Sequence, residues 1–380
     1  MRQFNANVLN VEEDILGIIT DKPVLVSRSR YVLLGQYSEG KTGYAATLSF
    51  SHSASGAKTI VFNVPETIGL NNGDVVLITP SGLCTVLYEI NSAHNAIMAT
   101  ERCNHRCIMC PQPPITQEKD KTDFNLRLID LFDSSTKEIG ITGGEPTLIG
   151  ENLFILIRHI QKRLPHAAIN ILSNGVKFAV RDFAKHLALC NHHDIQVDVP
   201  IFSDIAEEHN RIVGAKTFYK TVQGLYNLAL FQQRIGLRVV VHKQTYRRLP
   251  QLADYIYHNF PFVSQVAFMQ METIGLAESN LNQLWIDPFD YQNELREAVL
   301  LLRERGIPSF VYNAQLCVLP EDIRKYAVQS ISDWKDIYIE DCSECCCKGV
   351  CAGFFASNRE HHSAHIKALS DSINEPICLT

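Results

Sequence analysis

The stretch "ERCNHRCIMCPQPP" (residues 101–114) decides how the rest of this sequence is interpreted. Its three cysteines, Cys103, Cys107 and Cys110, follow one another at C-x3-C-x2-C spacing. A structural zinc site usually takes four ligands and a disulfide takes two cysteines. Three thiolates on one short loop suit a [4Fe–4S] cluster in which one iron stays open for another ligand. The alternative is a zinc site completed by His105 or by a distant ligand.

Length and composition describe an ordinary globular protein. The chain has 380 residues, of which 46% are hydrophobic and 20% charged, so it can bury a large core. The net charge of -6 gives no basic footprint for nucleic acid. No apolar run reaches the roughly 18 residues of a membrane span, and the start "MRQFNANVLNVEEDIL" lacks the apolar region of a signal peptide. We therefore expect a cytoplasmic protein without nucleic-acid or membrane partners.

The 12 cysteines are numerous and clustered. Three lie within residues 103–110 and five within 342–351, and the others are Cys84, Cys190, Cys317 and Cys378. In a reducing compartment they should be thiols or metal ligands and not disulfides. An isolated cysteine in an apolar run, such as Cys190 in "HLALC", is expected to be a small core residue.

The first segment, residues 1–95, is predicted to be a β-rich domain. It contains short β-like runs, "KPVLVSR" (22–28), "GYAATLSF" (43–50), "AKTIVFNV" (57–64), "GDVVLITP" (73–80) and "CTVLYEI" (84–90). A strong turn signal, "NNGD" (71–74), separates two of them. No long helical pattern occurs here.

Residues 96–310 alternate between strand-like and helical patterns. Strand-like runs lie at 95–100, 137–143, 167–173, 194–202, 236–243 and 263–270, with amphipathic stretches between them and a long helix expected over 289–306. Six β/α units in succession predict an α/β fold with a parallel sheet, here a partial (β/α)6 TIM-type barrel. In such folds the active site lies at the carboxyl ends of the strands. The cysteine triplet comes directly after the first strand. Residues 311–380 form an irregular cysteine-rich extension.

A second motif, "EIGITGGEPTL" (138–148), ends the second predicted strand. Gly143 and Gly144 allow backbone carbonyls to approach a ligand closely, Glu145 supplies a carboxylate for a ligand ammonium, and Pro146 fixes the turn. Alone this motif is weak. Its position one β/α unit after the cysteine triplet makes it a specific signal.

Together the two motifs resemble the radical S-adenosylmethionine (SAM) superfamily. The resemblance implies that Cys103, Cys107 and Cys110 hold a [4Fe–4S] cluster whose open iron chelates the amino and carboxylate groups of SAM. It also implies SAM contacts from Gly143, Gly144 and Glu145 to the ammonium, from Met109 to the adenine, from Ser173 and Asn174 at the end of the third strand, and from Ser203 to the ribose. Met109 departs from the pattern, because that position is often aromatic.

The chemistry implied by the resemblance is reductive cleavage of SAM. One electron from the cluster breaks the C5′–S bond and leaves a 5′-deoxyadenosyl radical, which removes hydrogen from an unactivated C–H bond. The protein then has to hold the target hydrogen close and exclude water.

The C-terminal stretch "DCSECCCKGVCAGFF" (341–355) resembles a SPASM or twitch extension. Cys342, Cys345 and Cys351 have C-x2-C-x5-C spacing, and Cys317 could be the fourth ligand of an auxiliary [4Fe–4S] cluster. Phe355 stands where the full SPASM pattern has another cysteine, and the upstream glycine-cysteine element is missing. Cys346 and Cys347 leave the register open, and a zinc site or unligated thiols are the alternatives. His361, His362 and His365 are expected to lie in a solvated tail.

The local sequence also resembles the His-Xaa-Ser system radical SAM maturases of the C type. The resemblance rests on "CNHRCIMCPQPP" (103–114), the β-rich start, and "CVLP" (317–320), "SISDWK" (330–335) and "CAGFF" (351–355). It implies a precursor peptide with His-Xaa-Ser repeats as substrate, and a second radical SAM protein and a small companion protein as partners. A metabolite-modifying enzyme with a closed barrel mouth, a non-catalytic partner subunit and a zinc-dependent interaction protein are the alternatives.

Overall fold

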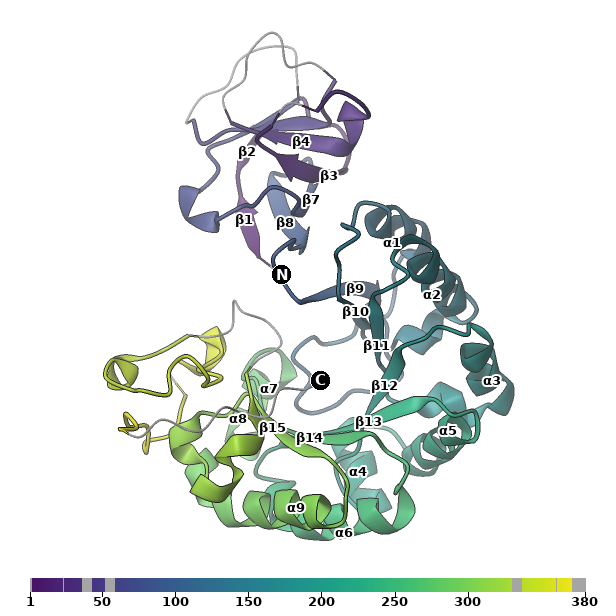
Figure 1. Ribbon diagram of the computed structural model, residues 1–380, viewed down its shortest axis with the longest axis vertical. Helices are drawn as coiled ribbons and strands as arrows, with labels where there is room; N and C mark the ends of the chain where they lie inside the picture. Colours follow the sequence, from purple (N-terminus) through teal and green to yellow (C-terminus); the bar gives the residue numbers. More distant parts are fainter. Residues whose placement is uncertain are drawn as a thin grey trace. The chain divides into compact units, whose positions relative to one another are not determined.

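The computed structural model describes residues 2–22, 24–35, 43–51, 59–329, 337–359 and 361–370 (Figure 1). "SISDWK" (330–335) and Cys378 lie outside these ranges. The chain divides into two compact units. One comprises Met1–Met98, Asp120–Gly140 and Ile155–Ala168, and the other comprises Ala99–Lys119, Ile141–Phe154 and Ile169–Thr380.

The N-terminal strands form one eight-stranded sheet in the order β1-β8-β7-β3-β4-β5-β6-β2. Its two end strands are consecutive in the chain and only Ala6 separates them, so one stretch pairs with β8 through its first half and with β6 through its second half. The sheet thereby closes on itself, which leaves no unpaired edge. The strands are β1 (Gln3–Asn5), β2 (Asn7–Leu9), β3 (Ile15–Thr20), β4 (Tyr31–Leu34), β5 (Ala46–Leu48), β6 (Ile60–Phe62), β7 (Val75–Ile78) and β8 (Leu83–Tyr88).

One strand prediction in this segment is wrong. "KPVLVSR" (22–28) contains no strand among its described residues, and its apolar side chains are exposed, Leu25 by 87% and Val26 by 75%. The expected runs at 43–50, 57–64, 73–80 and 84–90 do contain strands β5 to β8. Strands β1 to β4 were not predicted. Strands β1 and β2 have three residues each and carry little periodic signal, and β3 and β4 are mostly apolar runs that show no alternation of apolar and polar residues.

The second sheet has the strand order β16-β15-β14-β13-β12-β11-β10-β9, which is the order of the chain. Neighbouring strands from β11 to β16 pair in parallel. This confirms the predicted α/β fold with a parallel sheet. The strands are β9 (His94–Thr100), β10 (Glu138–Gly143), β11 (Ala168–Leu172), β12 (Ile195–Pro200), β13 (Arg234–Val241), β14 (Gln265–Gln270), β15 (Ser309–Tyr312) and β16 (Ala327–Val328).

Helices connect these strands because apolar residues recur at helical spacing between them. In α5, for example, Phe218, Thr221, Leu225 and Leu228 are buried at intervals of three and four residues. In the second unit, helices α3, α5, α6 and α9 lie along the outer side of strands β11 to β15 (Figure 1). The helices are α1 (Thr122–Ile129), α2 (Asn152–Arg163), α3 (Arg181–Leu189), α4 (Ala206–Val213), α5 (Phe218–Leu230), α6 (Leu249–Asn259), α7 (Leu276–Ser279), α8 (Leu281–Leu284) and α9 (Gln292–Glu304).

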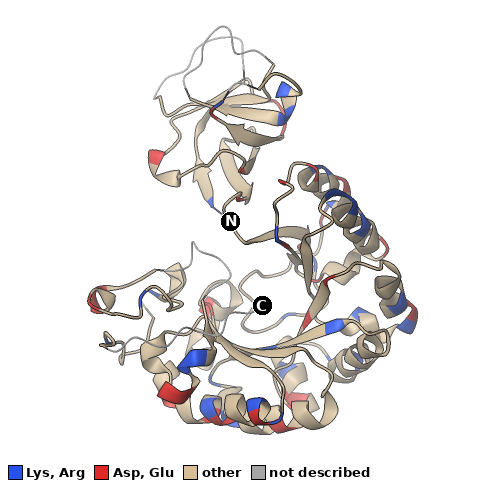
Figure 2. Ribbon diagram, viewed as in Figure 1, with Lys and Arg blue, Asp and Glu red and all other residues tan. Residues whose placement is uncertain are grey.

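Polar residues on a parallel strand indicate which face lies away from the helices. Val197 and Val199 of β12 are fully buried, whereas Asp198 and Pro200 between and after them line a cavity. Charged residues otherwise lie mostly on the helices (Figure 2). Within the described ranges, no helix combines the length and apolar character needed to cross a bilayer.

The packing of α5 gives a prediction about Gly224. A glycine in a helix interior costs about 1 kcal/mol relative to alanine, so Gly224→Ala should stabilise an isolated helix. Here the added Cβ would lie 2.2 Å from the backbone oxygen of Gly175. We expect the clash to win, lowering the free energy of unfolding by about 1–3 kcal/mol in urea denaturation. Gln223, the exposed neighbour, provides the control: Gln223→Ala should change the free energy of unfolding by less than about 0.5 kcal/mol. A Gly224→Ala protein that is more stable than the wild type would contradict this packing.

Candidate active site

A cavity of about 470 Å³ lies where the strands of the second sheet end. Its walls come from residues 101–114 after β9, which we call the cysteine loop, from the carboxyl ends of β10 to β14, and from Phe355 of the C-terminal extension. Every residue that lines it belongs to the second unit. We call it the main cavity. Its place matches the strand-end position where such folds carry their active sites.

One side of the cysteine loop is held by the end of α4. The backbone N–H of Arg106 donates to the Val213 carbonyl at 2.9 Å, and the N–H of Ile108 donates to the Ile212 carbonyl at 3.0 Å. The close approach requires Gly214, which adopts φ +65° and whose added Cβ would lie 2.9 Å from the Arg106 oxygen. The loop therefore has a fixed backbone although it contains no regular element.

The other side of the loop contacts the short helices α7 and α8. The N–H of Leu276 donates to the Cys110 carbonyl at 2.8 Å, and the Asn280 side chain donates to the Ile108 carbonyl at 2.9 Å. Gly275 adopts φ +64°, and a Cβ there would lie 2.8 Å from the Cys110 oxygen. Residues far apart in sequence thus fix the position of the third cysteine.

The three thiols of the loop, Cys103, Cys107 and Cys110, all line the main cavity. Burial raises the pKa of each of them, that of Cys107 to about 12. Mutual repulsion contributes at Cys107, whose pKa the other two thiols raise further. Neutral thiols at such a place become thiolates only when a cationic centre compensates the charge.

This donor set fits an iron–sulfur cluster. Among the described residues, no group of three or more His, Cys, Asp or Glu side chains could hold a single metal ion. Each thiolate of a cluster binds an iron of its own, so its ligands need not converge on one point. His105, the candidate fourth zinc ligand, is buried and its Nε2 lies 2.9 Å from the Thr217 hydroxyl. Burial lowers the pKa of His105 to about 4, so its ring is neutral.

The two glycines after β10 have a role that the sequence did not show. Added Cβ atoms at Gly143 and Gly144 would lie 2.0 Å from the Thr100 oxygen and 2.3 Å from the Arg102 oxygen. The N–H of Gly144 donates to Thr100 at 2.7 Å, and the N–H of Glu145 donates to Arg102 at 2.8 Å. The glycines therefore allow this loop to bond to the entry of the cysteine loop, in addition to the ligand approach expected from them.

Glu145 is buried and joins two strand ends. Its Oε1 accepts hydrogen bonds from the Thr147 N–H at 3.0 Å, the Thr147 hydroxyl at 2.6 Å and the Ser173 hydroxyl at 2.8 Å. Its Oε2 accepts from the Asn174 N–H at 2.6 Å. Burial raises the pKa of this carboxyl, and the four donors oppose the rise. Oε2 retains acceptor capacity for a further donor.

The remaining predicted SAM contacts divide into two groups. Met109, Ser173 and Asn174 line the main cavity, and Met109 packs with Phe202 in a buried cluster. Ser203 does not line it: its hydroxyl donates to Glu208 at 2.8 Å and accepts from the Ile205 N–H at 3.0 Å. The structure thus brings together all nine predicted SAM and cluster positions between residues 103 and 174. Ser203 lies apart from them, in the turn before α4.

Sequence analysis missed two charged strand residues of the main cavity, Asp198 and Arg238, and also Glu272, which follows β14. The Asp198 carboxylate accepts from the Asn170 amide at 3.1 Å and the Gln196 amide at 2.8 Å. Gly236 on the next strand leaves room for it, because an added Cβ would lie 1.9 Å from Asp198 Oδ1. Charged residues inside otherwise apolar parallel strands were the signal that could have identified both strand residues.

A second, smaller pocket gathers the C-terminal cysteines. It has a volume of about 20 Å³ and is lined by all four predicted ligands and by one alternate: Cys317, Cys342, Cys345, Cys347 and Cys351. We call it the cysteine pocket. The pKa of Cys351 is raised to about 11, mainly by burial, and the nearby thiols Cys317 and Cys342 raise it by smaller amounts. Cys346 is exposed and does not line the pocket, although its Sγ lies 3.6 Å from that of Cys347.

The histidines near the C-terminus contact the rest of the chain. The His365 ring stacks on Phe289 with ring centroids 3.8 Å apart, although His365 itself remains exposed. The His362 ring meets Phe354 edge-on at 5.5 Å, and His361 is exposed. The tail is therefore solvated, as expected, but it is also packed through His362 and His365.

Comparisons with known proteins agree with this geometry. Residues 97–256 match the family described as the Radical SAM superfamily. The match covers less than half of the chain and shows a radical SAM domain in that stretch. The matched residues contain both the cysteine loop and the GGEP turn (residues 143–146).

Two curated relatives resemble parts of the chain. The "Tungsten-containing aldehyde ferredoxin oxidoreductase cofactor-modifying protein" of Pyrococcus furiosus is 30% identical over 172 residues, which is 41% of this chain and 46% of that protein. The "GTP 3′,8-cyclase" of Campylobacter jejuni subsp. doylei is 35% identical over 97 residues, 24% of this chain and 29% of that protein. The chain thus spans less than half the length of either relative.

One solved structure shows the shared radical SAM fold over a longer stretch. "Native anSMEcpe with bound AdoMet" superposes with a TM-score of 0.50 at 17% sequence identity and covers 72% of this chain and 92% of that chain. At this identity the likeness concerns the fold alone.

The histidine behind the cysteine loop gives a pH prediction. Burial lowers the pKa of His209 on α4 to about 4, so the folded protein keeps this ring neutral. Because the unfolded chain takes up this proton below about pH 6.5, stability is present above that pH and is lost as the pH falls towards 4. We expect a loss on the order of 3 kcal/mol from this residue, at about 1.4 kcal/mol per pKa unit. Urea titrations at pH 7, 5.5 and 4.5 measure it.

His209→Asn is the matched variant for this measurement. An asparagine oxygen can still accept the Phe202 N–H that His209 Nδ1 accepts at 3.3 Å, but it does not titrate. The variant should lose less stability than the wild type between pH 7 and 4.5. Equal pH slopes in the two proteins would show that His209 does not titrate on unfolding.

Proposed function

We propose that this chain is a radical SAM maturase that modifies a ribosomally made precursor peptide with His-Xaa-Ser repeats. The observation that carries the proposal is the main cavity, where the three loop thiols, the GGEP turn and the ends of β11 and β12 meet. Cluster and SAM bound there supply the radical that removes a hydrogen atom from the substrate. The protein's own residues bind, orient and shield these groups.

The proposed roles follow the walls of the cavity. Cys103, Cys107 and Cys110 would hold the cluster. Gly143, Gly144 and Glu145 would receive the SAM ammonium at the turn after β10, where Glu145 Oε2 has spare acceptor capacity. Met109, Ser173 and Asn174 would contact the rest of SAM. Ser203 is a ribose contact only if its turn rearranges, because its hydroxyl is engaged with Glu208.

The open rim of the cavity supports a peptide over a small metabolite. Pro111 and Gln112, which line the main cavity, are exposed to solvent. A peptide needs such an entrance, whereas an enzyme for a small metabolite is expected to close its site. The names of the two curated relatives point to small-molecule substrates. The stretches shared with them cover only a quarter to two fifths of this chain, so they do not transfer a substrate.

The C-terminal cysteines support an auxiliary cluster of the SPASM or twitch type. Four thiols in one pocket are enough for a [4Fe–4S] centre, and Cys347 is a fifth. We propose Cys317, Cys342, Cys345 and Cys351 as ligands, with Cys347 as the alternate. Cys346 is disfavoured by its exposure. A single zinc ion is the alternative for this pocket, and it would remove any electron-transfer role. It would require the thiols to move, because no three His, Cys, Asp or Glu side chains of the described residues are arranged around one ion.

The organisation of the chain follows from these assignments. We propose a β-rich domain over residues 1–95, the radical SAM core over 96–310 and the auxiliary-cluster extension over 311–380. The sequence resemblance to the C-type His-Xaa-Ser maturases is the support for the precursor peptide, for the second radical SAM protein and for the small companion protein. The reaction belongs in the reducing cytoplasm, because the clustered cysteines must stay available as thiolates. A complete main cavity argues against a purely non-catalytic partner subunit.

The first test concerns SAM cleavage. Anaerobically reconstituted protein with a strong reductant should convert SAM to 5′-deoxyadenosine, and replacing Cys103, Cys107 and Cys110 with alanine should lower the yield at least about a thousandfold, to background. Liquid chromatography of the nucleoside products measures this. The scattered Cys190→Ala is the control and should retain the activity. Cleavage that persists in the triple variant would contradict the proposed cluster site.

The second test separates the two metal sites. Replacing Cys342, Cys345 and Cys351 with alanine should remove about four irons per chain and stop peptide modification, while part of the SAM cleavage survives. Iron analysis and peptide mass spectrometry give the two readouts. Cys346→Ala is the matched control, since this thiol lies outside the pocket. A wild-type protein with only four irons and no zinc would eliminate the auxiliary metal site.

A further inference from the structure

A short segment, Cys351–Asn358, runs from the cysteine pocket to the main cavity. Cys351 lines the cysteine pocket, and Phe355, only four residues later, lines the main cavity. Phe354 between them lines the cysteine pocket and a third pocket, which shares Gln270 and Met271 with the main cavity. We call residues 351–358 the strap.

The first half of the strap is a tight turn fixed by Gly353. This glycine has φ +60°, and an added Cβ would lie 2.8 Å from the Ile337 oxygen. Phe354 and Ile337 exchange two backbone hydrogen bonds, at 2.8 and 3.1 Å, and the Gln315 amide donates to the Gly353 carbonyl at 2.7 Å. The turn is therefore held from both sides, which limits where the next residue can lie.

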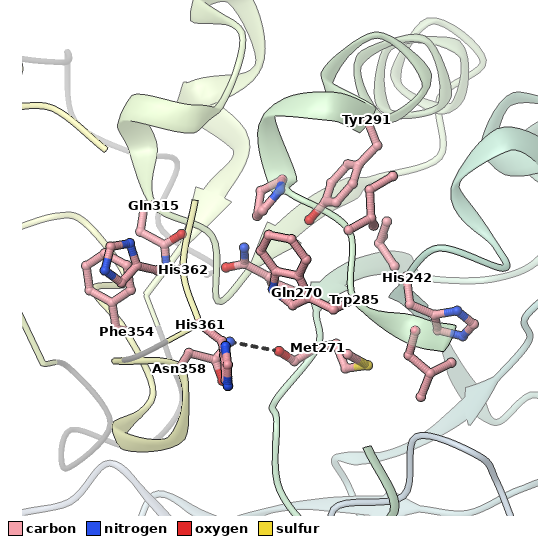
Figure 3. Close-up of a pocket in the computed structure, with 14 residues that line it drawn as sticks. His242, Gln270, Met271, Trp285, Tyr291, Gln315, Phe354, Asn358, His361 and His362 are labelled. Carbon is pink, nitrogen blue, oxygen red and sulfur yellow. Dashed lines mark hydrogen bonds between the residues drawn. The ribbon is translucent and has the colours of Figure 1, made fainter. Parts of the chain in front are cut away.

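The second half of the strap is bound to the end of β14. The Asn358 amide donates to the Met271 carbonyl at 3.1 Å (Figure 3). Its oxygen accepts from the Thr273 N–H at 3.1 Å and from the Thr273 hydroxyl at 2.8 Å. Asn358 is buried, so these bonds exchange with water only if the strap detaches. Phe355 is thus enclosed between a glycine turn and an anchored asparagine.

The environment of Phe355 places it on the substrate side of the main cavity. The proposed SAM contacts come from the cysteine loop and the ends of β10 and β11, whereas Phe355 comes from the extension. It shares the cavity with Met271, Glu272 and Asn313, which follow β14 and β15. Its side chain is 6% exposed. An aromatic wall at this place suits the apolar or aromatic part of a peptide side chain.

We propose that Phe355 is a substrate-contacting residue, and that the strap makes its position depend on loading of the cysteine pocket. This inference rests on the proposed peptide-maturase function. A metal centre bound through Cys351 fixes one end of the strap, and Asn358 fixes the other. The extension thereby shapes the peptide half of the main cavity. Phe355 stands where a longer cysteine motif would have another ligand. In this proposal it forms part of the wall that contacts the substrate.

The experiment is a double-mutant cycle on Phe355→Leu and Cys351→Ala. Binding of a fluorescently labelled precursor peptide is measured by anisotropy under anaerobic conditions, together with iron content. Phe355→Leu keeps an apolar side chain, should retain wild-type iron, and should weaken peptide binding about tenfold. It should also lower the amount of modified peptide per 5′-deoxyadenosine formed. Cys351→Ala should weaken peptide binding similarly, and the double variant should be no weaker than either single one, because coupled residues are non-additive.

Phe289→Ala is the control for a general loss of contact with the extension. Phe289 stacks on His365 but lines neither the main cavity nor the cysteine pocket. The peptide affinity of the Phe289→Ala protein should therefore stay within about twofold of wild type. Additive losses in the cycle would overturn the link between Phe355 and the cysteine pocket. An unchanged peptide affinity and product ratio in Phe355→Leu would overturn its substrate contact.

Two further outcomes separate this inference from the function on which it rests. A Phe355→Leu protein that loses SAM affinity as strongly as peptide affinity would place Phe355 against SAM and overturn the inference, with the maturase function intact. A wild-type protein that cleaves SAM but neither binds nor modifies the peptide would overturn the proposed substrate and the inference together.

Discussion

The architecture of the site depends on backbone hydrogen bonds that hold an irregular loop in place. The cysteine loop contains no helix or strand, yet its carbonyl and N–H groups bond to the turn after β10, to the end of α4 and to α7. Each of these contacts brings two backbones closer than any side chain would permit, and a glycine stands at each one: Gly143 and Gly144, Gly214, and Gly275. Thiols that must present themselves to one cluster require such a fixed frame, because a mobile loop would have to be ordered on binding.

The buried carboxylate of Glu145 extends this frame to the third strand. A charge removed from water is stable only when hydrogen-bond donors surround it, and here Thr147, Ser173 and Asn174 provide them. The residue that would recognise the SAM ammonium is therefore also the residue that fixes two strand ends relative to each other. Binding and scaffold functions overlap in one side chain, so the effects of changing it need to be separated by measuring stability alongside affinity.

Under the proposal that Phe355 contacts substrate, the C-terminal extension adds a substrate wall to the main cavity. The cysteine loop and the strand ends provide the thiols and the proposed SAM positions, whereas Phe355 belongs to a segment that begins in the cysteine pocket. The buried Asn358 bonds and the Gly353 turn make that contribution rigid. In the proposed arrangement, an auxiliary centre bound in the cysteine pocket would affect the shape of the main cavity in addition to any redox effect.

The sequence by itself determined the α/β class and the order of the β/α units, and it named the candidate positions for chemistry. Strong periodic patterns predict long elements, and the C-x3-C-x2-C and GGEP motifs are local, so both could be read without a structure. Strands as short as Gln3–Asn5 and Asn7–Leu9 could not, because their pairing with β8 and β6 depends on residues more than fifty positions away. The exposed stretch around Leu25 looked like a strand for the opposite reason: local β propensity with no partner strand. Tertiary structure alone decided that the Ser203 hydroxyl bonds to Glu208 and that Asp198 and Arg238 line the main cavity. It also decided that Cys347 and not Cys346 lines the cysteine pocket, and that Phe355 lines the main cavity. Each of these facts depends on which distant backbone a side chain meets, and the order of residues along the chain does not contain that information.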